Sequence, residues 1–110
     1  MHLREVQKRA WENKLAKGFN TTDLPLEFAL THAELSEAFE AARKHPDTLG
    51  EELADVLIFL ASIAEMAGVD LDSAVEAKMA KNVTRRYERS ATGTLTKVVE
   101  GPHSSTQATP

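Results

Sequence analysis

The pattern of apolar and polar positions predicts four helices, of which the third is the most apolar. From Gly50 to Met66, apolar residues cover more than half of the helical circumference, which is typical of a core helix. The other predicted helices span residues 3–17, 25–44 and 71–89. Residues that commonly end helices separate them, namely Gly18, Pro46 and Gly68. The pattern therefore predicts an all-α fold.

Two of these helices carry a pair of acids, spaced three residues apart, within their apolar faces. Glu52 lies in the middle of the apolar stripe of the third helix, and Asp55 lies at its edge. Glu34 and Glu37 occupy equivalent places on the second helix. A short connection makes the two helices antiparallel neighbours, so we expect the two acid pairs to face each other. Buried carboxylates are costly unless a positive charge compensates them, which predicts a bound cation.

The residue types narrow the choice of cation and ligand. Oxygen ligands without nearby His or Cys suit Mg²⁺, or Mn²⁺, rather than Zn²⁺. Lys78, Asn82 and Arg85 share one face of the fourth helix and could contact the phosphates of an anionic ligand. Either acid pair alone would be ordinary for a solvated helix, so the prediction rests on their combination.

Composition and charge agree with this picture. The net charge is −4, and the segment from Thr22 to Asp72 holds twelve acidic residues against two basic ones. Such an acidic centre argues against binding to a nucleic-acid backbone. No apolar run approaches the roughly 18 residues needed to span a bilayer, and no secretory signal is visible, so we expect a cytoplasmic protein without a membrane partner. We expect one helical domain over residues 1–90, followed by an extended or disordered, flexible C-terminal tail over residues 91–110, with residues 95–99 extended.

The acid pairs resemble those of the MazG-like nucleoside triphosphate pyrophosphohydrolases, whose pattern is E-E-x-x-E followed by E-x-x-D. Three strings look like the corresponding family segments: HAELSEAFEAARK, GEELADVLIFLASIAEMAGVDL and KMAKNVTRRY. The resemblance covers Leu3 to Arg89. It implies a four-helix bundle completed by oligomerisation, as a homodimer or homotetramer, and Mg²⁺-dependent hydrolysis of nucleoside triphosphates, which could be dNTPs or non-standard NTPs. Water would attack the α-phosphorus to give monophosphate and pyrophosphate.

The resemblance also implies roles for individual residues. The metal ligands would be Glu34, Glu37, Glu52 and Asp55, and the residues acting in catalysis would be Glu37 and Glu52. The substrate contacts would come from Lys78, Asn82 and Arg85 at the triphosphate, and from Trp11, Asn13 and Phe19 at the base. The first Glu of the family pattern falls on Ala33 here. The task of activating water would then pass to Glu37 or to Glu51.

Two alternatives remain open at the level of sequence. The chain could be a non-catalytic helical module that binds a cation, a nucleotide or a partner through its acidic cluster, which the alanine at position 33 favours. It could also be a phosphoribosyl-ATP pyrophosphohydrolase, which shares the all-α plan and acidic motifs, although its strings match less closely.

Overall fold

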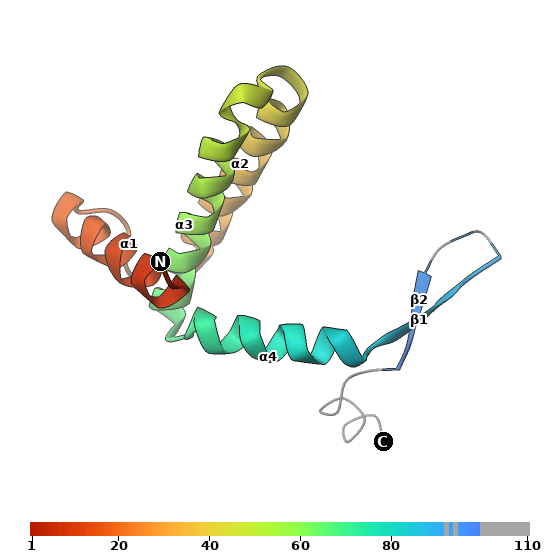
Figure 1. Cartoon of the computed structure of the whole chain (residues 1–110). Helices are drawn as coiled ribbons and strands as arrows, with labels where there is room; N and C mark the ends of the chain where they lie inside the picture. Colours follow the sequence, from red (N-terminus) through yellow and green to blue (C-terminus); the bar gives the residue numbers. More distant parts are fainter. Residues whose placement is uncertain (92, 94, 100–110) are drawn as a thin grey trace. The chain divides into compact units, whose positions relative to one another are not determined.

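The computed structural model describes residues 1–91, 93 and 95–99, and these residues confirm a predominantly helical fold (Figure 1). The four helices are α1 (Leu3–Lys17), α2 (Leu24–Lys44), α3 (Leu49–Ala67) and α4 (Leu71–Thr84). A single 3₁₀ turn, η1 (Pro46–Thr48), joins α2 to α3. The chain forms two compact units, which divide between Asp72 and Ser73.

Helix α3 is the centre of the first unit, because both α1 and α2 pack against it (Figure 1). Helices α2 and α3 run antiparallel, as the short connection between them predicts. Among the described residues, the buried apolar ones are mostly alanines: Ala10, Ala38, Ala41, Ala61 and Ala64, together with Ile63. Alanine at these contacts allows close helix packing, and it leaves the larger apolar side chains at other positions around each helix.

The helix ends of the first unit largely follow the sequence signals. Asp23 caps α2, since its Oδ1 accepts a hydrogen bond from the Leu26 amide at 3.0 Å. Gly68 ends α3 in the left-handed conformation, with a φ of 70°. Thr48 occupies the cap position of α3, but its hydroxyl donates to the carbonyl of His45 instead of capping the helix. The 3₁₀ turn draws that carbonyl within reach.

The end of α3 and the start of α4 are tied to α1 by polar contacts within the first unit. Buried Gln7 donates to the Val69 carbonyl at 2.8 Å and accepts from the Leu71 amide at 2.9 Å. Asp72 accepts from the amides of Leu3 and Arg4, both at 3.1 Å, and so caps the N-terminus of α1. These contacts join segments more than sixty residues apart in the sequence.

The second unit corrects the expected extent of the fourth helix. The helix was predicted to reach Arg89, but α4 ends at Thr84 and the strand β1 (Arg86–Arg89) follows. β1 pairs antiparallel with β2 (Leu95–Val99), in the segment expected to be extended. The helix ends at two β-branched residues, Val83 and Thr84, and the Thr84 hydroxyl donates to the Lys81 carbonyl. The part of the expected tail that follows Val99 lies outside the described residues.

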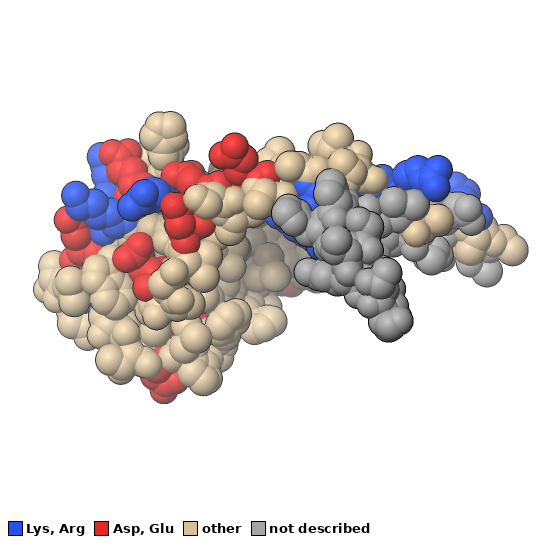
Figure 2. All heavy atoms as spheres, turned by 90° about the horizontal axis from the view of Figure 1, so that it is seen from below, with Lys and Arg blue, Asp and Glu red and all other residues tan. Residues whose placement is uncertain are grey.

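Large apolar side chains remain exposed on the two longest helices of the first unit. Leu35 and Phe39 on α2 are 54% and 63% exposed, and Leu53 on α3 is 51% exposed. Figure 2 shows a broad area of residues that are neither acidic nor basic on the face of this unit in view. Within the described part of the chain, none of the helices combines the length and apolar character needed to cross a membrane.

Candidate metal centre

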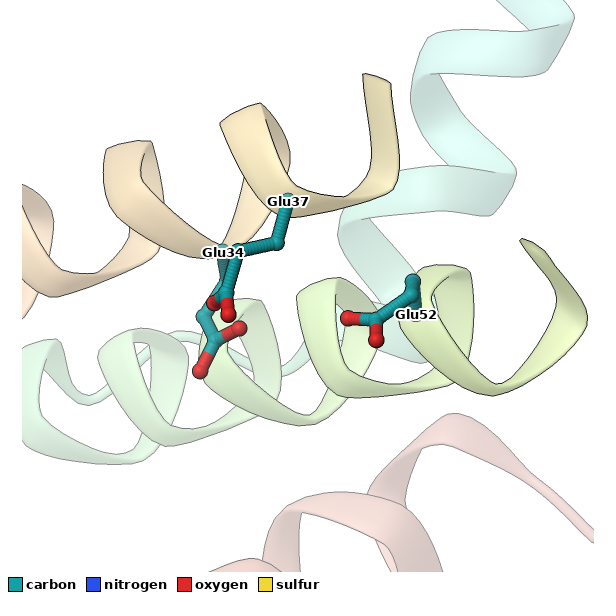
Figure 3. A group of neighbouring side chains, drawn as sticks. All are labelled: Glu34, Glu37 and Glu52. Atoms are coloured by element: carbon teal, nitrogen blue, oxygen red, sulfur yellow. The ribbon is translucent and has the colours of Figure 1, made fainter. Parts of the chain in front are cut away.

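Three of the four predicted ligands converge between α2 and α3. Glu34 and Glu37 extend from α2, and Glu52 extends toward them from α3 (Figure 3). Carboxylate oxygens of the three residues lie within 4.8 Å of one another. The i, i+3 spacing brings the two α2 side chains together, and the antiparallel packing supplies the third. Glu34 and Glu52 are half-buried, whereas Glu37 is exposed.

Asp55 lies beside this group without belonging to its closest set. It is half-buried on α3, one turn after Glu52. Its negative charge raises the pKa of both Glu34 and Glu52, which places it within electrostatic reach of the two. The four acids predicted to face each other therefore do gather at one place, with Asp55 at the edge.

The crowding of acids perturbs Glu34 most strongly. A side-chain hydrogen bond with Glu37 raises the pKa of Glu34 to about 7, and burial adds to the effect. The charges of Glu37, Asp55 and Glu52 act in the same direction. Without a cation, Glu34 therefore holds a proton through much of the neutral range, as like charges at close range require.

Glu52 shows the same effect from the other helix. Burial raises the pKa of Glu52, and the charges of Glu37, Asp55 and Glu51 raise it further. Among the described residues, the ion pairs that the structure forms involve none of the four clustered acids. The ion pairs described for residues 1–91, 93 and 95–99 therefore do not compensate the charge where the acids meet, and an added cation would do so.

An open groove adjoins the acids where α2 ends and α3 begins. It has a volume of about 310 Å³, and its walls include Glu37, Glu52, Ser36 and His45. This volume is at the lower end of the roughly 300–1,000 Å³ typical of small-molecule sites. Sequence reasoning gave His45 no role, since it is the residue that ends α2, and only folding of the connection brings it to the groove.

The residues expected to contact substrate occupy two different regions. Lys78 and Asn82 are exposed on α4, and Arg85 directly follows it, so all three lie in the second unit. Their contact with a triphosphate stays a prediction. In the first unit, half-buried Trp11 and exposed Asn13 lie on α1, and Phe19 lies in the loop that follows.

Asn13 and Phe19 meet at a small cavity between α1 and α3. The cavity has a volume of about 130 Å³, and Ile58 and Phe59 of α3 contribute to its wall. Trp11 does not line this cavity but faces a separate, polar surface hollow with Arg4 and Lys8. The structure therefore groups two of the three proposed base contacts and separates the third.

Sequence reasoning missed a buried ion pair next to this cavity. Lys14 Nζ lies 2.7 Å from Glu27 Oε2, and Glu27 is completely buried. A signal was present, because Glu27 precedes Glu34 by seven residues and so lies on the same stripe of α2. An acid in the first turn of a helix is usually explained by the helix dipole, so the sequence alone gave no reason to expect a buried basic partner for Glu27.

The all-α fold and the carboxylate cluster together define a candidate metal-binding helical domain. Residues 28–90, more than half of the chain, match the family model described as the MazG nucleotide pyrophosphohydrolase domain. The chain therefore belongs to the MazG family, as its acid pairs indicated.

The chain is also similar to part of a phage protein. Over 50 residues the chain is 46% identical to a protein of Salmonella phage PMBT28 named dATP/dGTP diphosphohydrolase. The matched stretch is 46% of this chain and 17% of the relative, so the chain spans only a small part of that protein. The comparison with solved structures found no match.

Proposed function

We propose that this protein hydrolyses nucleoside triphosphates to the monophosphate and pyrophosphate, in the cytoplasm. The observation that carries the proposal is the convergence of Glu34, Glu37 and Glu52, with oxygens within 4.8 Å, at a place without a compensating basic residue among the described ion pairs. Membership in the MazG family supports the same reaction.

The residues present fit a hard divalent cation. Carboxylate oxygens are the ligands that Mg²⁺ and Mn²⁺ prefer, and the raised pKa of Glu34 reflects charge that a cation would neutralise. Glu34, Glu37, Glu52 and Asp55 would hold the ion. When bound, Mg²⁺ would polarise the phosphate, lower the pKa of water and offset charge on the leaving pyrophosphate.

Glu37 and Glu52 are the acids that we assign to catalysis. Both line the open groove, so each can accept a hydrogen bond from a water molecule aimed at the α-phosphorus. Glu51 is exposed in the first turn of α3 and is the alternative base, since Ala33 has no carboxylate to offer.

For the substrate, we propose a purine deoxynucleoside triphosphate as the first to test. The name of the phage relative supports this choice. Lys78, Asn82 and Arg85 would bind the triphosphate through point-charge and bidentate contacts. Asn13 and Phe19 would read and stack on the base, with Trp11 as a further contact.

We also propose that a second copy of the chain covers the exposed apolar surface, giving a homodimer or homotetramer. The supporting residues include Phe28, Leu35 and Phe39 on α2, and Leu53, Leu57 and Leu60 on α3, all exposed in the single chain. Large exposed apolar areas are uncommon on monomers and mark interaction sites. Sedimentation analysis of the wild type and of Phe39→Ser would test the assembly, and an unchanged monomer in both would contradict it.

The decisive experiment measures pyrophosphate release from a panel of triphosphates with Mg²⁺. Glu52→Gln and Asp55→Asn should each lower kcat by at least about a hundredfold, because a metal ligand is lost while the side-chain shape is kept. Glu76→Gln is the control, since Glu76 is an exposed acid of α4 that is not among the residues lining the groove. Full activity of the Glu52 variant would refute the site.

A non-catalytic module is the second candidate, and the alanine at position 33 is the observation that favours it. Calorimetry together with the pyrophosphate-release assay separates the two. Binding of Mg²⁺ and a non-hydrolysable triphosphate, combined with an absence of pyrophosphate release from any triphosphate, would favour the module over the enzyme.

A further inference from the structure

The buried ion pair of Lys14 and Glu27 has no role in the chemistry proposed above. Lys14 is 7% exposed and Glu27 is 0% exposed, and their charged atoms lie 2.7 Å apart. Burying two charges is costly, and an apolar pair of similar volume is often as stable or more so. Stability alone therefore does not account for a charged pair here, and its contacts indicate what else it does.

Both members of the pair hold the loop between α1 and α2. Lys14 Nζ donates to the backbone carbonyl of Asn20 at 2.8 Å, and Asn20 Nδ2 donates to Glu27 Oε1 at 3.1 Å. The same Asn20 side chain organises the rest of the loop. Its Nδ2 donates to the Asp23 carbonyl, and its Oδ1 accepts from the amides of Thr22 and Asp23.

This loop carries Phe19 into the wall of the small cavity. Gly18 turns the chain with a φ of 71°, and the Phe19 amide donates to the Lys14 carbonyl at 3.0 Å. Lys14 and Glu27 themselves line the cavity with Phe19 and Asn13. The two residues proposed to contact the base are therefore placed by a network in which a buried ion pair supplies the anchor.

The cavity lies beside the acidic cluster along both helices. Phe59, in its wall, follows Asp55 by four residues on α3, which is about 6 Å along the helix axis. Glu27 precedes Glu34 by seven residues on α2, which is about 10 Å. These offsets suit a nucleotide whose base lies in the cavity while its phosphates reach the acids.

We propose that Lys14 and Glu27 are a positioning pair that fixes the loop of residues 18–23 and thereby sets recognition of the base, without taking part in hydrolysis. The proposal rests on the function proposed above. It predicts that disturbing the pair changes KM for the nucleotide and leaves kcat and the Mg²⁺ affinity largely intact.

The test uses a double variant that keeps the packing and removes the loop contacts. Lys14→Met/Glu27→Leu should retain the thermal unfolding midpoint of the wild type, because apolar residues of similar volume can replace a buried ion pair without loss of stability. Its KM should rise at least about tenfold with kcat within about threefold. Asn20→Ala keeps the ion pair but loses the loop contacts, and should show the same split. Lys17→Met is the control, since Lys17 is an exposed lysine of the same helix, and its kinetics should match the wild type.

A second measurement does not depend on activity. Amide hydrogen exchange of Thr22 and Asp23 should accelerate in both variants, because their acceptor, Asn20 Oδ1, is no longer held in place in the double variant and is absent in Asn20→Ala. An unchanged KM in the double variant, or unchanged exchange at both amides, would overturn the positioning role. A wild type without pyrophosphate release would overturn the proposed function instead, and the exchange result would then decide the role of the pair.

Discussion

Cation binding at the acidic cluster should release a proton, and the amount should depend on pH. Glu34 has a pKa of about 7 in the cation-free protein, because it shares a hydrogen bond with Glu37 and lies among negative charges. A carboxylate must be ionised to bind a hard cation. Lowering the pH from 8 to 6 therefore makes Mg²⁺ compete with a proton for the same oxygen.

The size of the effect follows from the pKa. At pH 6, one unit below it, about nine-tenths of Glu34 is protonated, and at pH 8 about one-tenth is. The apparent affinity for Mg²⁺ should fall about tenfold between these values, and about 0.9 proton should be released per ion bound at pH 6 against about 0.1 at pH 8.

Calorimetry in two buffers of different ionisation enthalpy measures this proton release directly. The Glu34→Gln variant cannot take up the proton, so its Mg²⁺ affinity should be weaker and should depend less on pH over this range. Glu76→Gln, which changes an exposed acid of α4, should keep the wild-type slope. An affinity for Mg²⁺ that stays constant from pH 6 to 8 in the wild type would refute the idea that Glu34 is a ligand in this crowded cluster.

Three further predictions concern stability. Without cations, the folded protein binds the Glu34 proton more tightly than the unfolded chain does, in which the pKa of Glu34 is 4.5. The free energy of unfolding in urea should therefore fall as the pH rises from about 5 to 8, and added Mg²⁺ should remove this trend. A free energy of unfolding that rises with pH over this range would contradict the prediction. Lys14→Met alone should lower the free energy of unfolding by about 3–5 kcal/mol, because it strands the fully buried charge of Glu27, and a loss below about 1 kcal/mol in urea titrations would contradict this. Gly68→Ala should cost about 1 kcal/mol, because Gly68 has a φ of 70° although a Cβ would meet no atom within 4 Å. Gly50→Ala, inside α3 with equal space, should not destabilise, and equal losses in the two variants would exclude backbone strain as the cause.

The acid cluster could be predicted from the sequence because the two acids of each pair are close together along one helix. The spacing of Glu34 with Glu37, and of Glu52 with Asp55, follows from helix geometry alone, and the short connection makes the two helices neighbours. The same reasoning did not foresee the bond of the Thr48 hydroxyl to the His45 carbonyl. It also failed for the end of α4, where pairing with a later strand replaces the last predicted turn of helix.

By itself, the sequence determined where the helices lie and which residues share a face, since periodicity and capping depend on neighbours within a turn. Only the tertiary structure decided which faces meet. It matched Glu27 with Lys14, and Asp72 with the start of α1. It also buried alanines and left Leu35 and Phe39 exposed. Hydrophobicity alone does not set these choices, because a helix with a wide apolar arc offers several faces, and close packing against α3 selects the face with the smallest side chains.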